Sequence, residues 1–209
     1  MTSDEFLRRW EAMPDLKHAD LIDGVVYMPS PLSRPHSAFH ILLAAWLRNY
    51  ESHTPGTESG LEATWIMGKR NVPQPDVALR VLPEFGGQSR DEGDYTGGAP
   101  ELVGEVALSS GACDLGAKFR LYERVGVHEY WVAVVPEARL IWYEWIKGSF
   151  CAREPDADGV YRSRSFPGLW LDTEAFWRRD GARVQVVLGH GLATPQHAAF
   201  VASLAAKKK

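Results

Sequence analysis

Two acidic side chains in apolar surroundings are the residues of this chain best suited to chemistry. Glu105 lies inside the apolar run 102–108, and Asp76 opens a second apolar run at 77–81. An ionised carboxylate buried in such a run is costly unless a cation or several hydrogen-bond donors meet it. We therefore expect both acids to serve a positively charged partner.

A divalent metal ion would be such a partner. Mg²⁺ takes carboxylate oxygens as ligands, and a bound divalent ion lowers the pKa of its water and stabilises charge on a reacting phosphate. Lys118, downstream of Glu105, could orient that water or neutralise phosphate. The three residues predict a metal-dependent phosphodiesterase site, in which Asp76 and Glu105 bind the ion and Lys118 assists.

Each of these residues also has a purely structural interpretation. Lys118 and Asp114 are four residues apart, a spacing typical of an ion pair on a helix surface. Asp76 would serve equally well as a turn residue before its strand. Glu105 could be the carboxylate of an edge strand that reaches solvent.

Two further groups near these acids in the sequence could take part. His36 could act as a base or contact phosphate, and with His40 it has the i,i+4 spacing of a transition-metal ligand pair. Ordinary histidines at the start of a helix are the more frequent explanation. Lys69, Arg70 and Arg80 could contact phosphate, but scattered surface charges are more frequent than such contacts.

The sequence also predicts the elements that must position these residues. Apolar pairs around Asp23-Gly24 predict a tight β-hairpin over 21–28, followed by a rigid proline-rich loop at 29–35. From His36 to Tyr50 the apolar residues fall at helical spacing, which predicts a long amphipathic helix that packs against a sheet.

The remaining pattern favours an α+β fold, with a mixed β-sheet flanked by helices. Ser3 or Asp4 is expected to cap a first helix, and Asp114 a helix that runs to about Val125. A terminal helix should start at Thr194-Pro195. We expect strands or extended segments at 61–67, 77–81, 101–109, 129–135, 140–146 and 166–171, and a loop without periodicity at 82–100.

Composition excludes several classes of protein. The chain has 209 residues and a formal net charge of −4, which argues against coating nucleic acid through bulk charge but leaves room for one basic face. Cys113 and Cys151 are too few for a disulfide framework or zinc knuckle. No apolar run approaches the about 20 residues of a membrane span, and no signal-peptide pattern opens the chain. We therefore expect a cytoplasmic protein without a membrane partner.

Several short motifs occur in the order and spacing of one known family. With them, the chain resembles the Uma-type restriction endonucleases, once a domain of unknown function, within the PD-(D/E)XK nuclease superfamily. The resemblance covers residues 15–175. The motifs are Asp20-Leu21-Ile22-Asp23-Gly24, residues 31–36, Pro75-Asp76-Val77, Leu102-Val103-Gly104-Glu105-Val106, and the series Lys118, Tyr122, Gly126-Val127 and Glu129-Tyr130-Trp131.

The resemblance implies a restriction-endonuclease-like core with added β-hairpins and Mg²⁺ or Mn²⁺ as the ion. It implies that Asp76 and Glu105 are the metal ligands, with Asp20, His36 and Tyr122 in accessory roles.

Two departures from the superfamily and family patterns concern the candidate site. The superfamily's lysine normally lies two residues after the second acid, where this chain has Ala107, so Lys118 on the following helix would take its place. At Asp20 the family tends to have the longer glutamate, which makes a third metal contact by Asp20 less certain.

These observations predict a metal-dependent endonuclease that hydrolyses DNA phosphodiester bonds, with DNA as its partner and a homodimer as its assembly. The whole chain, 1–209, would be one nuclease-like domain with its core at 15–175, a C-terminal helical extension at 172–206 and a frayed tail at 207–209. Two other functions stay open. One is a nuclease-fold binding or dimerisation module with a weakened site, and the other is a phosphohydrolase of small nucleotides.

Overall fold

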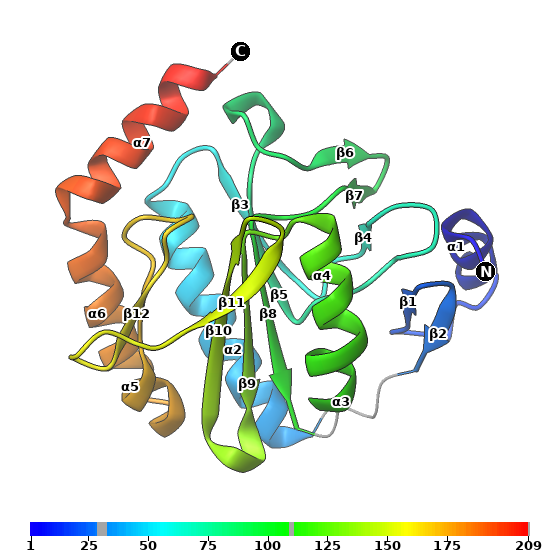
Figure 1. The fold of residues 1–209 in the computed structure, drawn as a ribbon, viewed down its shortest axis with the longest axis horizontal. Coiled ribbons are helices and arrows are strands. Elements are labelled where there is room, and N and C mark those ends of the chain that lie inside the picture. The colour runs from blue at the N-terminus through cyan, green and yellow to red at the C-terminus, as the bar shows by residue number, and fades with distance from the viewer. Residues whose placement is uncertain (29–32, 109–110, 209) are drawn as a thin grey trace.

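The centre of the fold is a mixed β-sheet (Figure 1). The computed structural model describes residues 1–28, 33–108 and 111–208. In this part of the chain β8 and β9 pair in parallel, and the other neighbours in the central sheet are antiparallel. Across the sheet the strands are β11 (Ser149–Arg153), β10 (Arg139–Ile146), β9 (Glu129–Val134), β8 (Leu102–Ala107), β5 (Val77–Val81) and β3 (Thr57–Leu61).

Helices cover both faces of this sheet, so the α+β class expected from the sequence is confirmed (Figure 1). The long helix α2 (Arg34–Ser52) and the C-terminal helices pack into one apolar cluster, and α4 (Phe119–Val125) packs into the cluster on the other face. The C-terminal helices are α5 (Thr173–Arg178), α6 (Gly181–Leu192) and α7 (Pro195–Lys207).

Strand β8 is buried along its whole length and carries Glu105. Leu102 and Val106 belong to the cluster that contains α2, and Val103 and Ala107 to the cluster that contains α4. Because side chains alternate along a strand, Glu105 points to the same face as Val103 and Ala107. It therefore faces the helix that follows β8.

The expected Asp-Gly hairpin is confirmed. Strands β1 (Asp20–Ile22) and β2 (Val25–Tyr27) pair antiparallel around a two-residue turn. Asp23 has φ 51° and Gly24 has φ 82°, the positive values that such a turn requires at both positions. Of the proline-rich loop that was expected next, residues 29–32 lie outside the described residues.

The helix expected from Asp114 begins earlier and is irregular. A short α-helical turn, α3 (Gly111–Cys113), leads into a π-helical turn, Asp114–Lys118, which continues as α4. Asp114 is therefore inside the helix rather than its cap, and the prediction of a cap was wrong. The left-handed Gly126 ends α4, as expected.

The segment 82–100 is not a structureless loop. It contains a 3₁₀ turn, Pro83–Phe85, and a hairpin of β6 (Arg90–Glu92) and β7 (Tyr95–Gly97), which pairs in parallel with β4 (Trp65–Ile66). The strand expected at 61–67 is correspondingly split between β3 and β4, with Glu62 at φ 51° between them. The charged hairpin lacks the apolar alternation that predicts a strand.

Other boundaries differ by small amounts. Thr2, not Ser3 or Asp4, caps the first helix α1 (Ser3–Glu11), and Ser33 caps α2. Thr194 caps α7 as expected, and that helix runs to Lys207; Lys209 and Ser109 lie outside the described residues. The remaining elements are a 3₁₀ turn at Val135–Glu137 and the strand pair β12 (Val160–Arg162) and β13 (Trp170–Asp172). Among the described residues, no helix has both the length and the apolarity to cross a membrane.

Candidate active site

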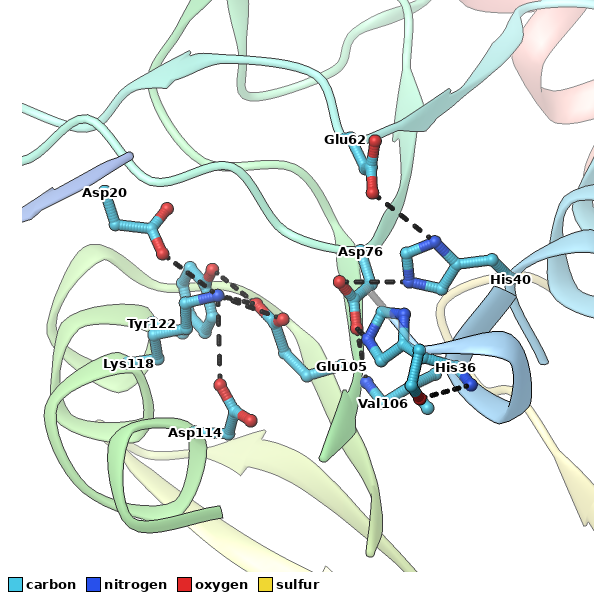
Figure 2. A network of polar contacts seen from close by, with 11 residues as sticks. Asp20, His36, His40, Glu62, Asp76, Glu105, Val106, Asp114, Lys118 and Tyr122 are labelled. Carbon is cyan, nitrogen blue, oxygen red and sulfur yellow. Dashed lines mark hydrogen bonds and ion pairs between the residues drawn. The ribbon is translucent and has the colours of Figure 1, made fainter. Parts of the chain in front are cut away.

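Glu105 is held by a cation and a hydroxyl inside the protein. Its side chain is 2% exposed, and β8 lies between β5 and β9, so the edge-strand interpretation was wrong. The Lys118 ammonium lies 3.0 Å from each of the two Glu105 carboxylate oxygens. The Tyr122 hydroxyl donates to Glu105 Oε1 at 3.0 Å. Figure 2 shows these three side chains meeting between β8 and the helix that follows it.

Lys118 is the centre of a group of acids and not a surface residue. It is 6% exposed, and its ammonium also lies 3.4 Å from Asp20 Oδ2 and 3.8 Å from Asp114 Oδ1. The interpretation of Lys118 and Asp114 as a helix-surface pair was therefore wrong, since both are buried. The π-helical turn between them is a rare geometry that often occurs at functional sites.

Asp20 joins this group through the first hairpin. Its Oδ1 accepts a hydrogen bond from the backbone N–H of Gln74 at 2.6 Å, while Oδ2 faces Lys118. The shorter aspartate thus reaches the cluster at the position where the family tends to have glutamate.

Asp76 lies beside this group and belongs to a second set of contacts (Figure 2). The backbone N–H of Val106, the residue after Glu105, donates to Asp76 Oδ2 at 2.6 Å. Asp76 directly precedes β5, and Glu105 lies on the neighbouring strand β8, with Val77 opposite Gly104. Asp76 and Glu105 are thus brought together as the sequence predicted.

Two histidines of α2 meet Asp76 from the other side. His36 Nε2 is 3.4 Å from Asp76 Oδ2, and His40 Nε2 is 3.1 Å from Asp76 Oδ1. His40 Nδ1 lies 3.5 Å from Glu62 Oε1. Sequence reasoning had treated His40 mainly as an ordinary helix residue and had missed Glu62; the i,i+4 histidine spacing was the available signal.

The electrostatics differ between the group around Lys118 and the contacts of Asp76 with the histidines. Burial raises the pKa of Glu105 well above its usual range, and neighbouring carboxyl groups add to the rise while Lys118 opposes it. Burial alone would lower the pKa of Lys118, but Glu105, Asp20, Asp114 and Asp76 together raise it well above its usual range. Three carboxyl groups thus surround one ammonium group, and the charge of Asp76 adds to theirs. This excess of acid favours a further cation.

At Asp76, in contrast to Glu105, the neighbouring groups outweigh burial and lower the pKa. Burial works against its charge, yet the two histidine rings hold the pKa of Asp76 well below its usual range. Burial also favours neutral His36, but contact with Asp76 dominates and raises the pKa of His36. Asp76 is therefore an ionised carboxylate at neutral pH.

The basic residues proposed as phosphate contacts are not gathered at this site. Arg80 is buried and donates to Glu58 at 2.5 Å and to Asp91 at 2.8 Å. Arg70 donates to the backbone oxygen of Asp23 at 2.6 Å, and Lys69 is exposed. Arg80 is thus already paired with two carboxylates. It also lies near the end of β5 that is farther from Asp76.

Comparison with known proteins identifies the family of the chain. A scan against protein families matches residues 3–174 to Uma2, described as "Putative restriction endonuclease". The chain belongs to the Uma2 family. No curated protein matches it. Among solved structures it is similar to one titled a "putative nuclease belonging to DUF820" from Anabaena variabilis, with a TM-score of 0.68 and 16% identity. The similarity covers 86% of this chain and 98% of that one.

The Uma2 acids of this chain fit a divalent ion. A carboxylate oxygen has more than one lone pair for hydrogen bonding or metal binding. Glu105 Oε1 accepts from both Lys118 and Tyr122, whereas Oε2 accepts from Lys118. Oε2 thus keeps acceptor capacity for a further partner. Oxygen ligands of this kind are those that Mg²⁺ and Mn²⁺ take.

Proposed function

We propose that this Uma2 chain is a metal-dependent endonuclease that hydrolyses phosphodiester bonds of DNA. The observation that carries the proposal is the meeting of Asp76, Glu105 and Lys118 across adjacent strands and the following helix, with Lys118 3.0 Å from both Glu105 oxygens. Membership of a family described as "Putative restriction endonuclease" supports the reaction class.

The residues have distinct roles in this proposal. Asp76 and Glu105 would hold Mg²⁺ or Mn²⁺, which when bound supplies an acidified water and a counter-charge for the phosphate. Lys118 donates hydrogen bonds and could orient the attacking water. Tyr122 fixes Glu105 Oε1 by its hydrogen bond, and Asp20 and Asp114 keep the ammonium of Lys118 charged. The water oxygen forms a bond to phosphorus as the phosphorus–oxygen bond to the leaving strand breaks.

Mg²⁺ binding is the first test, because a sequence-selective nuclease can look inert on the wrong DNA. We expect Mg²⁺ binding in calorimetry to disappear in Asp76→Ala and in Glu105→Gln proteins that remain folded. On a cleavable DNA, Glu105→Gln should lower kcat at least about a hundredfold, because several kcal/mol of metal-dependent stabilisation are lost.

Glu137→Gln is a matched control, since Glu137 is an exposed acid that pairs with Arg139. It should bind Mg²⁺ and cleave as the unmodified protein does. Cleavage that survives Glu105→Gln would contradict the proposal.

A specific observation favours a second candidate, a nuclease-fold binding module with a weakened site. Glu105 is 2% exposed, and both of its oxygens already accept from Lys118. If the folded wild-type protein binds no Mg²⁺ or Mn²⁺, even with DNA present, this candidate replaces the nuclease.

We also propose DNA as the macromolecular partner and a homodimer as the acting form, because cleaving both strands of a duplex needs two sites. DNA affinity should then fall as salt rises. Light scattering with and without DNA would measure the assembly, and a monomer bound to cut duplex would contradict the dimer.

A further inference from the structure

The histidine pair of α2 forms a ligand set of its own around Asp76. His36 and His40 lie one helical turn apart, with ring centroids 4.0 Å apart. One ligand atom each from His36, His40 and Asp76 lies within 4.8 Å of the other two. Glu105, whose oxygens face Lys118, is not part of this group of three. Two ring nitrogens and the Asp76 carboxylate therefore lie close enough together to hold one ion (Figure 2).

Nitrogen atoms in this group lack ordinary partners. His40 is 6% exposed, yet its Nε2, although close to Asp76, has no aligned hydrogen-bond partner among the described residues; the same holds for His36 Nδ1. A buried polar atom without a hydrogen bond costs free energy comparable to a lost bond. His40 Nε2 is aimed at the Asp76 carboxylate, where an ion would take up its lone pair.

The spacing of the group fits coordination. Ligand atoms about 2.1 Å from one ion are about 3.0 Å apart at a right angle and about 3.4 Å apart at a tetrahedral angle. His40 Nε2 lies 3.1 Å from Asp76 Oδ1 and His36 Nε2 lies 3.4 Å from Asp76 Oδ2. These separations match coordination of one ion by both rings and by both oxygens of the carboxylate. On its other side, His40 Nδ1 faces Glu62, and such a carboxylate orients a ligating imidazole and makes it more basic.

We propose that His36, His40 and Asp76 bind a divalent first-row transition ion, with Glu62 positioning His40. Imidazole nitrogen favours such ions over Mg²⁺, which prefers oxygen. The inference goes beyond the nuclease assignment, because it holds whether or not the chain cleaves DNA. It also assigns Asp76 to two ligand sets, one with Glu105 and one with the histidines.

Binding of the metal alone tests this inference. Calorimetry at about pH 8, where free imidazole is neutral, would compare Co²⁺, Zn²⁺ and Mg²⁺, and the visible spectrum of bound Co²⁺ would report nitrogen coordination. We expect one tight Co²⁺ or Zn²⁺ site and much weaker Mg²⁺ binding. Glu62→Gln removes an orienting partner and should weaken Co²⁺ binding about 10- to 100-fold. His40→Gln removes a ligand and should weaken Co²⁺ binding by more than that.

Three further variants make the result decisive. His36→Gln changes a less buried ring, so it tests the site even if His40→Gln does not fold. His53→Gln removes an exposed histidine at the end of the same helix and should leave Co²⁺ affinity unchanged. Glu105→Gln should abolish Mg²⁺ binding but spare Co²⁺ binding, which separates this site from that of the proposed nuclease.

The inference is overturned if folded His36→Gln and His40→Gln proteins bind Co²⁺ as the wild type does. It is equally overturned if the wild type binds no Co²⁺ or Zn²⁺, in which case the rings serve only as proton-bearing partners of Asp76.

Discussion

Gly104, next to Glu105 on β8, is the residue that allows β9 to pack closely against the acid-bearing strand. It lies directly opposite Trp131 in the parallel pairing of β8 and β9. A Cβ at this position would lie 2.1 Å from Cζ2 of the Trp131 ring. Trp131 is completely buried, so it has no solvent-exposed position to move to. The absence of a side chain at residue 104 thus helps fix the strand on which the site is built.

We expect Gly104→Ala to destabilise the protein by at least the about 1–3 kcal/mol typical of overpacking a core. Urea unfolding followed by Trp fluorescence would measure it. Gly116→Ala is the control: among the described residues, no atom outside its own helical turn lies within 4 Å of the added Cβ, and alanine is the better helix former by up to about 1 kcal/mol. If Gly104→Ala is as stable as the unmodified protein, the packing argument fails.

At the residue scale, the sequence predicted the acids but not everything around them. A carboxylate within or beside an apolar run can be recognised from the sequence alone, and so Asp76 and Glu105 were identified. The approach of His40 and Glu62 to Asp76 depends on how α2 crosses the sheet, which no local pattern encodes. Asp114 was misinterpreted because an acid near a helix start is usually a cap.

At the scale of elements, local chemistry was a good guide where the turn itself dictates the structure. Asp23-Gly24 predicted its hairpin because few residues accept positive φ at two successive positions. The hairpin of β6 and β7 was missed because its residues are charged and its partner β4 is distant in sequence. Its pairing is set by tertiary contacts rather than by propensity.

The start of α7 gives a prediction about pH. His197 Nε2 lies 3.0 Å from the Thr54 hydroxyl, and Nδ1 lies 3.0 Å from the Leu192 carbonyl oxygen. Burial lowers the pKa of His197. The unfolded chain therefore takes up this proton more readily, and stability falls as the pH drops below about 6.5, the ordinary value of histidine.

His197→Gln should lose less stability than the wild type between about pH 7 and pH 5, because the unfolded state no longer gains that proton. Urea midpoints across this range would measure the difference. His190→Gln, at an exposed position of α6, should show the slope of the wild type. Parallel slopes for the wild type and His197→Gln would rule out the linkage.

At the scale of the whole molecule, the C-terminal helices complete the core on the α2 side of the sheet. Phe176 of α5, Leu188 of α6 and Leu204 of α7 belong to the same buried cluster as Trp46 of α2. The Phe39 and Phe176 rings lie 5.0 Å apart. We therefore propose that residues 1–209 form one folding unit, although the Uma2 match ends at residue 174.

Deleting residues 173–209 should abolish cooperative thermal unfolding, because it exposes the apolar side of α2. Scanning calorimetry would show a single transition for the full chain and none for the shortened one. Deleting only 208–209 removes the cation–π contact of Lys208 with Phe85 and should cost at most about 1 kcal/mol. A shortened chain that still melts cooperatively would show that the extension is a separate unit.

The ammonium of Lys118 also has a consequence for how the protein is made. Many small metalloproteins cannot fold until their ion arrives, because their ligands repel one another in its absence. Here the ammonium group of Lys118, which is part of the chain itself, already neutralises charge on Asp20, Glu105 and Asp114. We therefore expect the newly synthesised chain to reach its final shape without metal, and the proposed ion would bind to a site that has already formed. Under the proposed function, the ion would be selected after the chain has folded, and the supply of metal would control activity rather than folding.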